Sequence, residues 1–132
     1  MAYEVGSLLA AAGAVLVTGG LGGVMESASR GCSEAGGLVL GILPDSDRAS
    51  ANPYVDIAIP SGMGHARNIL VAQTAQALIA VEGSLGTLSE IAIGLKTGRP
   101  VFLLSSTLQV DGAILVANAQ QAVSAALLAL KE

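Results

Sequence analysis

The sequence predicts an α/β protein built on a doubly wound parallel sheet with helices on both faces. Apolar, β-branched runs alternate along the chain with stretches of helical periodicity, which is the order of elements in such folds. Two of the runs, 77–81 and 101–104, contain no polar residue, as is typical of strands buried on both faces. No linker or charge run divides the 132 residues, so one domain over residues 1–132 is expected.

Each element has its own signal. Six apolar runs predict strands at residues 14–18, 38–43, 55–59, 78–82, 101–104 and 114–116. Helices are expected over roughly 3–12, after the first glycine-rich turn, within 63–76, and on two stripes with helical spacing: Leu88, Ile91, Ala92 and Leu95, then Ala122, Val123, Ala126, Leu127 and Leu130. The polar segment 44–53, which includes Asn52, is predicted to be an exposed loop.

The composition excludes several classes of protein. Hydrophobic residues make up 52% and charged residues 12%, which rules out a disordered chain. The net charge is −4 and no basic run occurs, so no nucleic-acid partner is expected. The longest apolar run, 8–17, is about half a membrane span, and no secretory leader opens the sequence, so a cytoplasmic protein is predicted. With so few charges, part of the surface is expected to be buried in a homodimer or homotetramer. The first candidate surface is the predicted helix after the second glycine turn, with Leu88, Ile91, Ile93 and Leu95, and the second is segment 63–76.

A glycine-rich turn occurs twice, each time between a predicted strand and a predicted helix. Segment 17–26 aligns without gaps on segment 81–90, with Val, Gly, Leu, Gly and Glu at matching places. Such turns let backbone N–H groups and the positive end of a helix meet an anion, most often a phosphate. The alternative is a pair of tight turns without a ligand. The candidate ligand contacts are Gly19, Gly20, Leu21, Gly22 and Gly23 in the first turn, and Gly83, Ser84, Gly86 and Thr87 in the second. Neither turn has the Lys of a P-loop, which disfavours NTP hydrolysis of that type.

A third candidate segment, 61–68, places Arg67 on the first turn of a predicted helix, just after a glycine turn that holds Met63. An Arg there can bind a phosphate with two N–H groups at once, and Met63 joins the candidate contacts. The alternative is a solvated arginine on the helix surface.

Glu90 has two interpretations. The run from Thr87 to Glu90 matches a capping box, in which Thr caps the helix and Glu reaches back to it. Alternatively, Glu90 faces the ligand. His65 is the single histidine, so a multi-histidine metal site is excluded, and Cys32 is interpreted as a small packed residue.

These motifs resemble the lysine-decarboxylase-like superfamily, which includes the cytokinin-activating phosphoribohydrolases. The segments that carry the resemblance are 18–25, 62–68 and 83–100, and they cover nearly the whole chain in the right order. Within the superfamily the chain looks most like the branch of the molybdenum cofactor carrier proteins. The resemblance implies a Rossmann-like fold, dimers or tetramers, and a phosphate-bearing ligand at the glycine turns, which in this branch is the pterin molybdenum cofactor.

The hydrolases of this superfamily share the pattern Pro-Gly-Gly-x-Gly-Thr-x-x-Glu with an Arg-Lys pair upstream. Here Glu82, Ser84 and Asn68 depart from that pattern, whereas Arg67, Gly83, Gly86, Thr87 and Glu90 match it. The resemblance therefore favours a binding or carrier protein over the alternative, a phosphoribohydrolase that cleaves nucleoside 5′-monophosphates with Arg67 and Glu90 as its catalytic pair. A third hypothesis is a structural oligomer without a ligand. Lysine decarboxylation is not expected, because Lys96 and Lys131 are predicted on helices away from the turns.

Superfamily members begin with a strand ahead of the helix that spans roughly 3–12 here. This first strand is missing from the sequence, and a gap between core strands is expected in its place. Either the natural protein begins before Met1 or the site lacks one wall.

Overall fold

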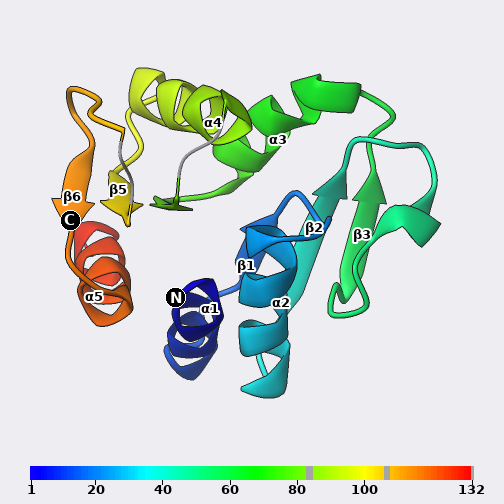
Figure 1. Cartoon of the computed structure of the whole chain (residues 1–132), viewed down its shortest axis with the longest axis horizontal. Helices are drawn as coiled ribbons and strands as arrows, with labels where there is room; N and C mark the ends of the chain where they lie inside the picture. The colour runs from blue at the N-terminus through cyan, green and yellow to red at the C-terminus, as the bar shows by residue number, and fades with distance from the viewer. Residues whose placement is uncertain (83–84, 106–107, 132) are drawn as a thin grey trace.

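The computed structural model describes residues 1–82, 85–105 and 108–131 (Figure 1). It has two three-stranded sheets, in the orders β1-β2-β3 and β4-β5-β6, and every described strand pairing is parallel. The strands are β1 Leu16–Thr18, β2 Val39–Leu43, β3 Ile57–Pro60, β4 Leu78–Val81, β5 Val101–Leu104 and β6 Ile114–Val116. The helices are α1 Ala2–Ala11, α2 Val24–Glu34, α3 Arg67–Thr74, α4 Leu85–Lys96 and α5 Ala119–Ala129, with short 3₁₀ turns η1 Arg48–Ser50 and η2 Gly64–Ala66. The predicted strands and helices are thus confirmed to within a few residues at their ends.

Strand β5 shows why an uninterrupted apolar run forms a buried parallel strand. Val101 and Leu103 pack against Ile91 of α4. Leu104 packs instead with Ala122 and Val123 of α5. Because successive side chains of a strand point to opposite faces, helices α4 and α5 cover opposite faces of this sheet. The prediction of helices on both faces is confirmed here.

The sheet of β1, β2 and β3 is covered in part by α1 and α2, which pack closely on each other. Cys32 and Ala28 of α2 form a cluster with Leu16 of β1 and Val39 of β2. Cys32 is fully buried, so its interpretation as a packed residue is confirmed. Burial raises the pKa of its thiol, which keeps it protonated and unreactive.

No described strand pairing joins the two sheets, and β1 and β4 are the edge strands at which the sheets approach each other (Figure 1). A cleft of about 940 Å³ occupies this position, and both strands line it together with Val5 and Leu9 of α1 and residues of α3, α4 and α5. The expected gap between core strands is present. None of the described helices combines the length and apolar character needed to cross a bilayer.

Candidate functional site

The candidate site lies where chain segments following β1 and β4 reach the cleft. Gly19 follows β1 directly, and Gly86 and Glu90 lie on α4, which follows β4. All three line the cleft, as do Arg67 and Asn68 from the start of α3. The structure therefore brings Gly19 of the first glycine turn together with Arg67 and with Gly86, Thr87 and Glu90 at the start of α4.

Arg67 is a buried cation that forms no ion pair with any described residue. It is the first residue of α3, and its side chain is only 9% exposed. Its Nη1 donates to the Oδ1 of Asn68, whereas its Nε is buried and has no hydrogen-bond partner among the described residues. Within those residues, no carboxylate lies within 4.0 Å of the guanidinium. The solvated-surface interpretation of Arg67 is therefore wrong, because its helix begins inside the cleft rather than on the outer surface.

The first glycine turn closes around Arg67. A Cβ on Gly19 would lie 2.6 Å from Arg67 Nη2 and 2.7 Å from Met25 Sδ, so a larger residue here would displace the ends of these two side chains. The amide of Gly20 donates to Thr18 Oγ1 at 3.0 Å, which fixes the turn at the end of β1. Of the five candidate contacts in this turn, Gly19 lines the cleft, whereas Gly20, Leu21, Gly22 and Gly23 do not.

Asn52 holds the first glycine turn in place, a role the sequence does not predict. Its backbone N–H donates to the carbonyl of Gly20 at 2.8 Å, and its Nδ2 donates to the carbonyl of Leu21 at 3.0 Å. The prediction of an exposed loop is wrong for this residue, which is only 7% exposed. Its amide is buried because the carbonyls of the turn need donors once they leave the strand.

In the second glycine turn, Gly83 and Ser84 lie outside the described residues, whereas Gly86, Thr87 and Glu90 line the cleft. Helix α4 begins at Leu85, so Thr87 lies inside its first turn. The capping-box interpretation is wrong for this reason, since it requires Thr87 to precede the helix. Glu82, at the entrance to the turn, has φ 63°, a left-handed conformation that proline cannot adopt and that is concentrated at functional sites.

Glu90 shares the cleft with Arg67. Burial raises the pKa of its carboxyl group to about 6, and the positive charge of Arg67 opposes this rise. The balance shows that Arg67 offsets only part of the cost of burying the carboxylate. Near neutral pH, Glu90 is therefore a carboxylate that gains a proton more readily than an ordinary glutamate.

Replacement of Glu90 with Gln is expected to stabilise the protein at high pH and not at low pH. In the unfolded chain Glu90 titrates near 4.5, and in the folded protein near 6. The buried charge therefore costs nothing below pH 4.5, and its cost grows to about 2 kcal/mol above pH 6, at about 1.4 kcal/mol per unit. Urea unfolding of the wild type and Glu90→Gln at pH 4 and pH 8 measures this difference. Glu4→Gln, at an exposed position, is the control, and an equal effect of Glu90→Gln at both pH values would contradict the electrostatic explanation.

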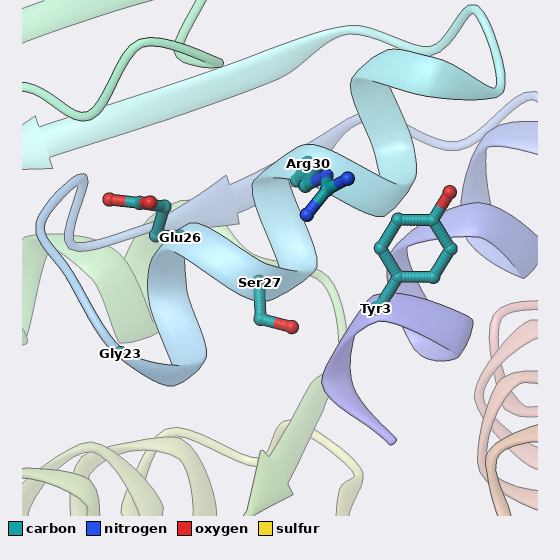
Figure 2. Close-up of a pocket in the computed structure, with 5 residues that line it drawn as sticks. All are labelled: Tyr3, Gly23, Glu26, Ser27 and Arg30. Atoms are coloured by element: carbon teal, nitrogen blue, oxygen red, sulfur yellow. The ribbon is translucent and has the colours of Figure 1, made fainter.

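The structure has a second, smaller hollow of about 420 Å³ on α1 and α2, lined by Tyr3, Gly23, Glu26, Ser27 and Arg30 (Figure 2). The cation of this hollow, Arg30, already has an ion-pair partner. Arg30 Nε lies 3.1 Å from Glu34 Oε2, the Tyr3 hydroxyl donates to Glu34 Oε1 at 2.6 Å, and the guanidinium lies 5.9 Å from the centroid of the Tyr3 ring. Because this charge is exposed and paired, the cleft with the buried Arg67 is the stronger candidate.

The remaining predicted residues near the site are in the turn before α3. Met63 is 47% exposed and does not line the cleft, whereas His65 does. Among the described residues, no group of three or more His, Cys, Asp or Glu side chains is arranged to hold a metal ion.

The fold and the site together define an α/β protein with parallel sheets, whose cleft beyond the strands combines a glycine turn with a buried arginine. The chain belongs to the SLOG cluster4 family, whose family model matches residues 1–129.

Known proteins with similar sequences and structures agree with this assignment. An uncharacterised protein of Archaeoglobus fulgidus is 44% identical over 124 residues, which cover 94% of this chain and 82% of that protein. The molybdenum cofactor binding protein of the phototrophic bacterium Rippkaea orientalis is 35% identical, with a TM-score of 0.92 over 99% of this chain and 86% of that chain. The molybdenum cofactor carrier protein of Chlamydomonas reinhardtii is 34% identical, with a TM-score of 0.88 over 100% of this chain and 87% of that chain.

Proposed function

We propose that this protein binds a phosphorylated small molecule in the cleft, with the phosphate on Arg67. The observation that carries the proposal is the buried guanidinium, which has a free Nε and no carboxylate within 4.0 Å among the described residues. A dianionic phosphate would supply the missing charge and accept two parallel hydrogen bonds. The absence of a side chain on Gly19 leaves room for the guanidinium itself, because a Cβ there would lie 2.6 Å from Nη2.

The ligand we propose is the pterin molybdenum cofactor, held by a carrier or storage protein that does not transform it. The similarity to cofactor-binding and carrier proteins over nearly the whole chain supports this choice. The cleft is large enough for a tricyclic ligand, and its walls include apolar residues such as Val17, Ile79 and Ile91, against which a flat ring system can pack. The phosphate would lie on Arg67, with Gly19 and the start of α4 beside it.

A phosphoribohydrolase is the second candidate, and the pKa of Glu90 favours it. A carboxyl group that titrates at about 6 is suited to proton transfer near neutral pH. In this case Arg67 would anchor the 5′-phosphate, and Glu90 would activate water or stabilise the oxocarbenium-like sugar.

Two measurements on the same protein separate these functions. For a carrier, pterin fluorescence is expected to co-elute with the wild-type protein on anaerobic gel filtration after incubation with the cofactor, and to be lost with Arg67→Ala. Incubation with a panel of nucleoside 5′-monophosphates is expected to release no free base. Free base that appears with the wild type and disappears with Glu90→Gln would reject the carrier and establish the hydrolase. Failure of the cofactor to co-elute would reject the carrier directly.

Assembly as a homodimer or homotetramer stays a prediction. Ile91 is 1% exposed and packs inside the chain, so it does not contribute to an outer surface. Ile69 of α3 is 41% exposed, and Ile93 of α4 is half-buried. Together with Leu85, the first residue of α4 and 86% exposed, these two side chains are apolar groups that the adjacent helices α3 and α4 would offer to a second copy.

A further inference from the structure

Asn68 connects Arg67 to the second glycine turn. The two residues are neighbours at the start of α3, and both are buried, with 9% of Arg67 and 6% of Asn68 exposed. The Oδ1 of Asn68 accepts from Arg67 Nη1, and its Nδ2 donates to Ser89 Oγ at 3.2 Å. Ser89 Oγ in turn donates to the carbonyl of Gly86 at 2.8 Å. A continuous chain of hydrogen bonds therefore runs from the guanidinium to the first turn of α4.

The polarity of this chain fixes the orientation of the Asn68 amide. A guanidinium offers only donors, so the oxygen of the amide must face Arg67. The NH₂ group then faces Ser89, whose hydroxyl proton is committed to Gly86 and whose oxygen is free to accept. Each of these contacts pairs a donor with an acceptor, so the chain of hydrogen bonds holds the side chains of Arg67, Asn68 and Ser89 in one arrangement.

Asn68 carries no charge, and for the charge of Arg67 this matters as much as the position of the Asn68 side chain. An aspartate at this position would also accept from Arg67, but it would neutralise the guanidinium and leave little net charge for a ligand. An asparagine holds the same atom without adding a charge. Glu90 interacts electrostatically with Arg67, and the two side chains lie too far apart to form an ion pair.

We infer that Asn68 is a positioning residue that sets the preference of the site for a dianionic phosphate, by holding Arg67 in place while leaving its charge uncompensated. Through Ser89, it also keeps the start of α4 at a fixed position relative to the guanidinium. This inference rests on the proposed phosphate site. It extends that site to a residue that touches the ligand only through Arg67.

The test compares the affinities of adenosine 5′-monophosphate and adenosine, because their ratio measures what the phosphate contributes. The wild type is expected to prefer the nucleotide. Asn68→Asp is expected to lower this preference at least about tenfold, while adenosine binding and thermal stability are retained. The reason is that the aspartate neutralises Arg67, and a hydrogen bond from a charged group to the phosphate contributes a factor of this size. Asn68→Ala leaves the charge of Arg67 uncompensated but removes the hydrogen bond that holds the guanidinium, so a smaller decrease in the preference is expected. A residue with a merely structural role would change both affinities together and would leave their ratio unchanged.

The outcomes separate the inference from the proposed function. A wild type without preference for the nucleotide would reject the phosphate site itself. A wild-type preference that survives in a folded Asn68→Asp variant would reject the role of Asn68 alone. If Asn68→Asp does not fold, Ser89→Ala tests the other end of the chain, because it leaves the charges intact. It is expected to weaken nucleotide binding about threefold without an effect on adenosine, and an unchanged nucleotide affinity would overturn the inference.

Discussion

Replacement of Arg67 with Ala is expected to weaken the binding of phosphorylated ligands by about 10- to 150-fold. The range follows from the 1.5–3 kcal/mol that a hydrogen bond to a charged group contributes, at about 1.4 kcal/mol for each factor of ten. Arg67→Lys keeps the charge but loses the second, parallel hydrogen bond, so its affinity is expected to fall between those of the wild type and Arg67→Ala. Isothermal titration calorimetry with adenosine 5′-monophosphate measures all three proteins.

Arg67→Ala is expected to weaken ligand binding without lowering the stability of the protein. A buried charge without a counter-ion costs free energy, and Arg67 has only the Asn68 amide as a described hydrogen-bond partner, with its Nε unsatisfied. At pH 4, where Glu90 is protonated and its burial no longer depends on the Arg67 charge, Arg67→Ala should therefore unfold at a temperature equal to or above that of the wild type, as expected for a residue retained for binding. Arg30→Ala is the control, because it removes an exposed arginine and tests for a general effect of net charge. A large loss of stability in Arg67→Ala, with unchanged affinity, would show that Arg67 is structural and would remove it from the site.

The order of strands and helices was predictable because each element carries its own signal. The run Val101–Leu104 is apolar at every position, and the structure buries all four residues between α4 and α5. Residues from each of the three candidate segments, among them Gly19, Arg67 and Gly86, line one cleft, since segments that follow parallel strands emerge at the same edge of a sheet. Arg67 was identified because a glycine turn precedes it at the start of a helix.

The residues that support the site could not be predicted, because their partners lie far away in the sequence. Asn52 binds the carbonyl of Leu21 across 31 positions, and Asn68 binds Ser89 across 21. A polar residue in a polar segment gives no local sign that it will be buried, so Asn52 was expected on the surface. For Thr87, a local signal was present and misleading: with Thr87 as the cap the helix would begin at Leu88, whereas α4 begins three residues earlier, at Leu85.

The packing of α1 on α2 depends on two glycines, and Gly31→Ala is expected to lower the free energy of unfolding by about 3 kcal/mol. A Cβ on Gly31 would lie 2.0 Å from the carbonyl oxygen of Tyr3, and one on Gly6 would lie 2.0 Å from that of Ala28. Both neighbours are backbone atoms of a helix, which cannot rotate away as a side chain can. The helices would have to separate, and overpacking of this kind costs about 1–3 kcal/mol or more.

Helix propensity alone predicts the opposite sign for Gly31→Ala, since alanine is favoured over glycine in a helix interior by about 1 kcal/mol. The sign of the measured change in urea unfolding therefore distinguishes close packing from local propensity.

Gly22→Ala is the matched control, because it adds the same methyl group where no other atom lies within 4 Å, and a change of less than about 0.5 kcal/mol is expected there. Gly6→Ala should resemble Gly31→Ala, and the double variant should cost less than the sum of the two, because the first substitution already separates the same pair of helices. A Gly31→Ala protein as stable as the wild type would mean that α1 can move away from α2 at no cost. Because Val5 and Leu9 of α1 form one wall of the cleft, such freedom would also mean that this wall of the ligand site is not fixed.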